Sequence, residues 1–148
     1  MKTLFDATEV FLEGPIPPEL AGEFQERFRA DHSVGAHLVF LGQVRADEIA
    51  SGTVTGIEYS AHETMARTAF ADLVERVTSG SDIAGLAIRH SLGYVPAGGA
   101  SLLIAVATGH REQAYALSRE LLEAIKREVP IYGREITNGD RSQWKVNR

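Results

Sequence analysis

Cysteine is absent from the 148 residues of this chain. Its absence excludes disulfide bonds, thiolate metal ligands, cysteine nucleophiles and persulfide carriers. Any sulfur chemistry would therefore have to use sulfur that another molecule brings. The sequence also lacks a Walker loop, a G-x-G-x-x-G motif and a G-x-S-x-G motif, so nucleotide-binding and hydrolase folds lose their usual support.

Long hydrophobic runs are absent as well. No stretch approaches the roughly 18–20 apolar residues of a membrane span, and residues 1–6 contain no apolar signal-peptide core. We therefore expect a cytoplasmic protein that does not enter membranes. With 44% hydrophobic residues and only 5 prolines, the composition predicts one ordered domain over residues 1–148.

Basic charge is scarce overall, because 15 Lys and Arg stand against 20 Asp and Glu, for a net charge of -5. Together with 7% aromatic residues, this argues against a general nucleic-acid or anionic-membrane binder. The balance reverses in residues 126–148, which hold six bases and three acids. We therefore expect an anionic ligand to meet the C-terminal part of the chain.

Apolar periodicity and turn residues predict alternating strands and helices. Pro17 and Pro18 suit the first turn of a helix, Pro130 ends another, and Asn138-Gly139 favours a hairpin turn. The predicted strands cover 9–12, 36–45, 54–62, 83–91, 100–107, 131–136 and 142–146, and the predicted helices cover 17–30, 63–78 and 112–128. The fold class is therefore α+β, with an antiparallel sheet and a C-terminal hairpin.

Residues 62–66 begin like the helix of a zinc protease, with His62 and Glu63. Ala66 occupies the position where that motif needs its second histidine. One imidazole without its partner does not hold the metal, so we expect no metal site.

Residues 108–111 join a predicted strand to a predicted helix. His110 and Arg111 would there lie beside free helix N–H groups, which is an anion-binding arrangement. The alternative is that Arg111 is a solvated first-turn residue and His110 a helix cap. The local sequence favours neither interpretation.

Lys126 lies in the last turn of the third predicted helix, where the helix dipole favours a cation. Capping is therefore its simplest role. Yet it follows the apolar Ile125 and comes one turn after Leu122, so it borders the apolar face, where partial desolvation fits a lysine for acid, base or nucleophilic work. Of the other candidates, Arg45 has a simpler role in pairing with a nearby acid, and Trp144 one in packing.

The order and spacing of five short motifs make residues 35–148 resemble the catalytic, large subunit of molybdopterin synthase. The motifs are Phe40-Leu41-Gly42-Gln43-Val44-Arg45, Ile57-Glu58-Tyr59, His90-Ser91-Leu92-Gly93, Gly109-His110-Arg111 with Ala114-Tyr115, and Lys126-Arg127-Glu128-Val129-Pro130-Ile131-Tyr132. The resemblance implies an α/β-hammerhead-like fold and a homodimer within a heterotetramer. Each protomer would bind a ubiquitin-like small subunit whose C-terminal Gly-Gly thiocarboxylate supplies sulfur. Precursor Z, a cyclic pyranopterin monophosphate, would receive two sulfurs and become the dithiolene of molybdopterin, with no further cofactor.

The resemblance also assigns roles to particular residues of this chain. It implies four catalytic residues, which are Lys126, Arg45, His110 and Arg111. It implies substrate contacts at Gln43, Val44, Arg45, His110, Arg111, Lys126, Gly133, Arg134, Glu135 and Arg148. Arginine and histidine suit the phosphate and pterin, while Lys126 suits the assistance of sulfur attack and of phosphate ring opening.

Two positions depart from the family pattern. Gly133 replaces the second lysine that the family has after its Pro-Ile-Trp stretch, and Gln43 replaces another lysine. A second hypothesis is therefore a catalytically weakened homologue that binds the pterin or the partner without efficient turnover. A third is an unrelated α+β module that binds another phosphate through its basic C-terminal segment.

Helix geometry adds a constraint that is independent of the family. His110 and Lys126 are sixteen residues apart, which is about 24 Å at 1.5 Å per residue. The two side chains therefore cannot share a small pocket within one chain. If both act on one substrate, His110 and Arg111 must come from a neighbouring protomer across a two-fold interface.

Overall fold

The computed structural model describes residues 4–139 and 142–144. In this part of the chain, the strands form one sheet with the order β2-β6-β5-β4-β7-β8. Their bounds are β2 Ala36–Gln43, β4 Gly52–Ala61, β5 Ile83–Pro96, β6 Ala100–Thr108, β7 Ile131–Thr137 and β8 Ser142–Trp144. All neighbours along this order are antiparallel, and β7 with β8 forms the predicted C-terminal hairpin. Two short strands join at the side: β1 (Phe11–Glu13) pairs in parallel with β5, and β3 (Glu48–Ile49) pairs with β4.

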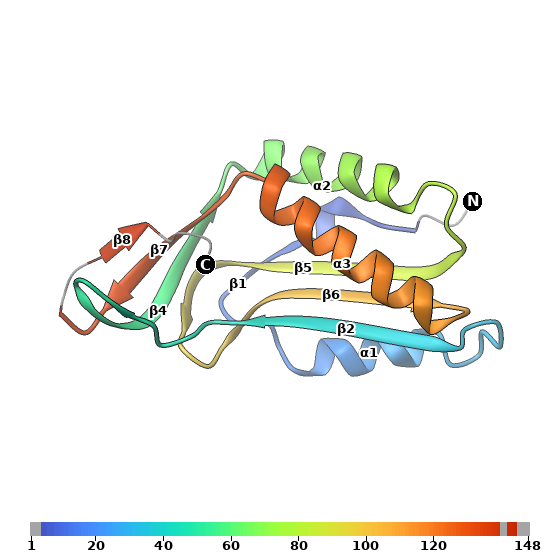
Figure 1. The fold of residues 1–148 in the computed structure, drawn as a ribbon, viewed down its shortest axis with the longest axis horizontal. Coiled ribbons are helices and arrows are strands. Elements are labelled where there is room, and N and C mark those ends of the chain that lie inside the picture. The colour runs from blue at the N-terminus through green and yellow to red at the C-terminus, as the bar shows by residue number, and fades with distance from the viewer. Residues whose placement is uncertain (1–3, 140–141, 145–148) are drawn as a thin grey trace.

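Helices cover both faces of the sheet (Figure 1). Strand β6 shows why, because its side chains alternate between two apolar clusters. Leu102, Ile104 and Val106 pack with α2 (Glu63–Thr78) and α3 (Arg111–Glu128). Leu103 and Ala105 point the other way and pack with Phe24 and Phe28, which belong to the short helix α1 (Glu19–Arg27) and its C-terminal cap. The central strands are therefore buried on both sides.

The close approach of α1 to the sheet depends on a glycine in β5. A Cβ atom built on Gly85 would lie 2.0 Å from the ring of Phe28, so no larger residue fits there without displacement of the ring. Because of this approach, the Phe28 side chain is only 8% exposed and covers the apolar cluster between α1 and the sheet. Burial of one such aromatic side chain contributes about 1.5–3 kcal/mol.

The two larger predicted helices are confirmed, with α3 beginning one residue earlier, at Arg111. The largest difference concerns β5, which continues through Pro96, whereas the predicted strand ends at residue 91. The reason is pairing: Ile57 lies opposite Val95 and Tyr59 lies opposite Gly93, so β4 supplies backbone partners for this extension. Strand β3 and the 3-10 helix η1 (Ala7–Glu9) are short elements without a periodic signal of their own.

Candidate active site

A cavity of about 300 Å³ opens where β2 ends against α3, β4 and β7. Its wall includes residues of the segment that follows β2, residues from the floor of the sheet, and Lys126 from α3. Those that bear on function are Gln43, Val44, Arg45, Asp47, Tyr59, His90, Ser101, Lys126 and Glu135. We call this cavity the larger lobe.

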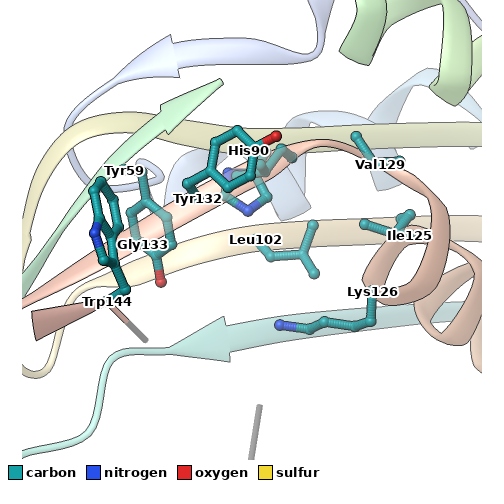
Figure 2. A pocket seen from close by; sticks show the side chains of 10 residues that line it. Tyr59, His90, Leu102, Ile125, Lys126, Val129, Tyr132, Gly133 and Trp144 are labelled. Atoms are coloured by element: carbon teal, nitrogen blue, oxygen red, sulfur yellow. The ribbon is translucent and has the colours of Figure 1, made fainter. Parts of the chain in front are cut away.

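A second cavity, of about 200 Å³, adjoins the first and is called the smaller lobe. Its wall contains Tyr132, Gly133 and Trp144 from the C-terminal hairpin, together with apolar residues at the end of α3. Four residues line both lobes, namely Tyr59, His90, Leu102 and Lys126. The two lobes therefore form one cleft with these four residues at the junction. Figure 2 shows the smaller lobe and the four shared residues.

Lys126 extends from the last turn of α3 across the junction (Figure 2). The residue is exposed as a whole, but the surroundings of its amine desolvate the charge, and this lowers the pKa of Lys126 below the ordinary lysine value. The nearby carboxylate of Glu123 raises the same pKa and offsets part of the effect. A lysine with a lowered pKa gives up its proton more readily, which suits a proton donor at the junction.

Arg45 is held by an acid of the same loop. Its Nε lies 3.3 Å from Oδ1 of Asp47, and a terminal nitrogen lies 3.3 Å from Oδ2. The guanidinium is thereby oriented at two points, while 63% of the side chain stays accessible. The next acid along the chain, Glu48, accepts a hydrogen bond from the Thr53 hydroxyl at 2.5 Å. Arg45 thus presents a fixed cation to the larger lobe.

Buried polar groups form the floor of the junction. The hydroxyl of Tyr59 donates to Oγ of Ser101 at 3.1 Å, and Nδ1 of His90 lies 2.8 Å from the carbonyl oxygen of Ser91. Because a carbonyl only accepts, Nδ1 carries a proton. Burial raises the pKa of Tyr59, with a smaller contribution from the Glu135 carboxylate, so the phenol stays protonated. The two hydroxyl groups are uncharged hydrogen-bonding partners for whatever enters the cleft.

Tyr59, His90 and Ser101 were not among the residues that sequence reasoning assigned to the site. The available signal was a polar residue within a strand that is otherwise apolar, as at Ser101 in β6. Such a residue, which is only 7% exposed here, needs a hydrogen-bond partner or a ligand.

His110 and Arg111 lie at the opposite end of α3 from Lys126. His110 is the N-cap residue, without a side-chain capping bond, and Arg111 is the first helical residue; both are exposed. Neither lines the two lobes as far as the described residues define them. Within one chain, the structure does not bring them to Lys126.

Three further predicted residues follow one another on β7 and lie in different surroundings. Gly133 lines the smaller lobe, and Glu135, only 2% exposed, lines the larger one. Arg134 instead pairs with Glu58, which lies directly opposite it on β4, at 3.4 Å. Arg148 lies outside the described residues.

Gln43 and Val44 lie on the wall of the larger lobe, where β2 ends. Val44 is 3% exposed, and its N–H donates to the carbonyl of Gly99 at 2.9 Å. The buried side chain and the backbone bond anchor the segment that carries Arg45.

The described part of the chain contains no group of three histidine or acidic residues that could hold a metal ion. None of the helices within residues 4–139 is long and apolar enough to cross a membrane.

Comparison with known proteins assigns this arrangement to a family. The model of the MoaE protein family matches residues 17–128, which include strands β2 to β6, helix α3 and Lys126. The chain belongs to the MoaE family. Among curated MoaE relatives, the molybdopterin synthase catalytic subunit of Dictyostelium discoideum is 35% identical over 80% of this chain and 76% of its own length. That of Aspergillus fumigatus is 33% identical over 78% of this chain, which spans only 61% of that longer protein.

Solved structures show the same MoaE fold. Molybdopterin synthase from Staphylococcus aureus superposes with a TM-score of 0.80 at 28% identity, covering 94% of this chain and 97% of the other. A complex of subunits 1 and 2 of the molybdopterin-converting factor from Helicobacter pylori also gives 0.80, at 23% identity, over 99% of this chain and 92% of that one. The α+β fold and its antiparallel sheet are therefore those of the family.

Proposed function

We propose that this chain is the sulfur-transferring subunit of a molybdopterin synthase, acting in molybdenum cofactor biosynthesis. It would move sulfur from a thiocarboxylated ubiquitin-like small subunit onto precursor Z. Support comes from the curated relatives, which are named molybdopterin synthase catalytic subunits. The absence of cysteine fits this function, since the partner then supplies the sulfur.

The observation that carries the proposal is the position of Lys126 at the junction of the two lobes. A reaction between a protein tail and a small pterin needs two adjoining spaces and one proton-transfer group that both reactants reach. The larger lobe, with Arg45, suits the anionic pterin. The smaller lobe, which Gly133 leaves free of a bulky side chain, suits an extended Gly-Gly tail.

The chemistry then follows from the groups at the junction. The thiocarboxylate sulfur forms the new carbon–sulfur bond with the pterin, and the carbon–oxygen bond to the cyclic phosphate breaks as Lys126 donates its proton to the departing phosphate oxygen. Water then hydrolyses the thioester that still joins the sulfur to the small subunit, so the sulfur stays on the pterin and the small subunit leaves with a C-terminal carboxylate. Arg45 stabilises the phosphate charge that the opening of the cyclic phosphate creates. His110 and Arg111 would add further contacts to the phosphate from a second protomer.

The second protomer is proposed from the geometry of β2. Within the described residues β2 pairs only with β6, so its outer edge is open. Its first residue, Ala36, pairs with Thr108 next to His110, and its last residue, Gln43, borders the cleft. An antiparallel pairing of two β2 strands around a two-fold axis brings the His110 end of one protomer to the cleft of the other, because eight residues span about 26 Å.

Reconstitution tests the proposed function. Purified protein, thiocarboxylated small subunit and precursor Z are mixed, and the dithiolene product is followed by chromatography. We expect product that depends on the thiocarboxylate. A folded protein that binds the small subunit and forms no product would contradict the synthase function and favour the weakened homologue.

Gly133 is the observation that favours this second candidate. It lines the smaller lobe at the position where the family carries a lysine, and no described residue of the same chain replaces the charge, because Arg134 is directed to Glu58. Restoration of the lysine separates the two candidates, as argued in the Discussion.

A further inference from the structure

Tyr59 and Ser101 meet although their strands are not neighbours. Tyr59 belongs to β4 and Ser101 to β6, with β5 between them. The position opposite Tyr59 on β5 is Gly93, and the position opposite it on β7 is Gly133. Directly opposite residues share a face of the sheet, so neither neighbouring strand places a side chain directly opposite the phenol. A ring lies beside it on the diagonal: His90 of β5 packs edge-on against Tyr59, with the ring centroids 5.1 Å apart. The phenol ring can therefore cross β5 and reach Oγ of Ser101 at 3.1 Å.

The direction of this hydrogen bond determines what Ser101 can do. A phenol is a stronger acid than an aliphatic alcohol, so Tyr59 is the donor and Ser101 the acceptor. The serine keeps its own proton and can donate it to another group. Both residues are buried, at 9% and 7% exposure, and Ser101 also lines the larger lobe. The pair therefore offers the cleft one oriented, uncharged donor.

The charges of the larger lobe explain why such a donor matters. Two cations, Arg45 and Lys126, stand there with two acids, Asp47 and Glu135, and Arg45 is already paired with Asp47. Net charge alone therefore gives little preference for an anion in this lobe. A hydroxyl donor adds a bond to an anionic oxygen without the desolvation cost of another charge.

We propose that Ser101 binds a phosphate oxygen of the ligand in the larger lobe and that Tyr59 is its positioning residue. The identification of the ligand as the pterin phosphate rests on the proposed function. The Ser101 hydroxyl donates to the phosphate, and Tyr59 restricts the rotation of that hydroxyl so that its proton points into the cleft. A serine without Tyr59 retains the donor and loses the orientation.

The experiment compares Ser101→Ala, Tyr59→Phe and the double variant. Tyr94→Phe is the matched control. The Tyr94 hydroxyl also donates one hydrogen bond within the sheet, to the carbonyl of Thr55 at 3.1 Å, and Tyr94 lines neither lobe. Two readouts are used: the affinity for inorganic phosphate, measured by NMR titration, and KM and kcat for precursor Z in the reconstituted system. Thermal unfolding monitors the fold of each variant.

We expect Ser101→Ala to weaken phosphate binding about tenfold and to raise KM for precursor Z by a similar factor. Tyr59→Phe should weaken binding about threefold, and the double variant should bind no more weakly than Ser101→Ala, because the two residues act through one donor. Unchanged phosphate affinity in Ser101→Ala, or an equal loss in Tyr94→Phe, would overturn the proposal. A wild-type protein that forms no dithiolene would overturn the proposed function alone, since phosphate binding still decides the role of the pair.

Discussion

Both ends of α3 carry basic residues, but the residue at the C-terminal end lies in a cleft and those at the N-terminal end are exposed to solvent. At the C-terminal end, Lys126 reaches into a cleft between β2 and β7, and desolvation lowers its pKa. At the N-terminal end, His110 and Arg111 are exposed and no side chain caps the helix. At the C-terminal end the side chain lies in a cleft, whereas the N-terminal end presents an arginine and a histidine to solvent beside helix N–H groups that no described side chain caps.

Helix electrostatics sharpens this difference. The negative end of the helix dipole favours Lys126, whereas the positive end disfavours Arg111. An arginine in a first turn gains when an anion bridges it to the free N–H groups. The comparison therefore teaches that the N-terminal end is the half that depends on a ligand, and the open edge of β2 provides a way to bring it to one.

The largest expected effect comes from the C-terminal end. Lys126→Ala should lower turnover by about 10²–10⁴-fold, because the proton donor at the junction is lost. The fold should survive, since the residue is exposed. Arg127→Ala is the matched control, because it removes a cation from the same helical turn. Arg127 pairs with Glu128 and lines neither lobe. Equal losses in both variants, measured in the reconstituted system, would contradict the assigned role.

Loss of activity from a substitution at the N-terminal end of α3 should be complemented by a second protomer that carries the intact residue. Arg111→Ala and Lys126→Ala are each expected to be nearly inactive, yet mixed dimers contain one cleft with an intact Lys126 and an intact partner Arg111. Random mixing after co-expression should restore about a quarter of wild-type turnover. No recovery from dimers shown to be mixed by mass spectrometry would place Arg111 outside the shared site.

Gly133→Lys tests whether the C-terminal half lacks a cation. The new side chain would stand opposite Tyr59 on the face of the smaller lobe. For a competent synthase we expect a gain in kcat of less than about tenfold, as a second proton-transfer group adds to Lys126. A gain from near zero would instead identify the wild-type chain as the weakened homologue. Ser60→Lys is the matched control, because Ser60 is exposed on the neighbouring strand β4 and lines neither lobe.

From the lowered pKa of Lys126 we predict how kcat and the free energy of unfolding depend on pH. Because the ammonium is the acid, kcat should fall as the pH rises through a pKa below that of ordinary lysine, and Lys126→Arg should lack this limb. The unfolded chain holds this proton more tightly than the folded one, so the free energy of unfolding should rise with pH over the same window. Chemical denaturation at several pH values checks the second prediction, which Lys126→Met should abolish.

Much of the fold could be predicted because its signals are local. The apolar spacing of α3 and the apolar run over residues 102–107 of β6 each identify an element without reference to any other part of the chain. The parallel pairing of β1 with β5 has no such signal, because it depends on which strands meet in space. Part of the site could not be predicted for the same reason. Tyr59 and Ser101 are 42 residues apart, and they meet because the strand register places Tyr59 of β4 opposite Gly93 of β5.

The alternation of side chains along a strand, in contrast, could be read from the sequence. It underlies the prediction with the smallest expected effect, which concerns Arg134. Successive residues of β7 face opposite sides of the sheet, so the burial of Glu135 in the larger lobe directs Arg134 away from it, toward Glu58. Arg134→Ala should therefore change turnover by less than about twofold, and the loss of an exposed ion pair should cost no more than about 1 kcal/mol of unfolding free energy. Glu58→Ala is the matched control, since it removes the same pair from the other strand. A large loss of activity in Arg134→Ala alone would show that this arginine compensates for Gly133 after all, reaching the substrate in an assembly that the single chain does not form.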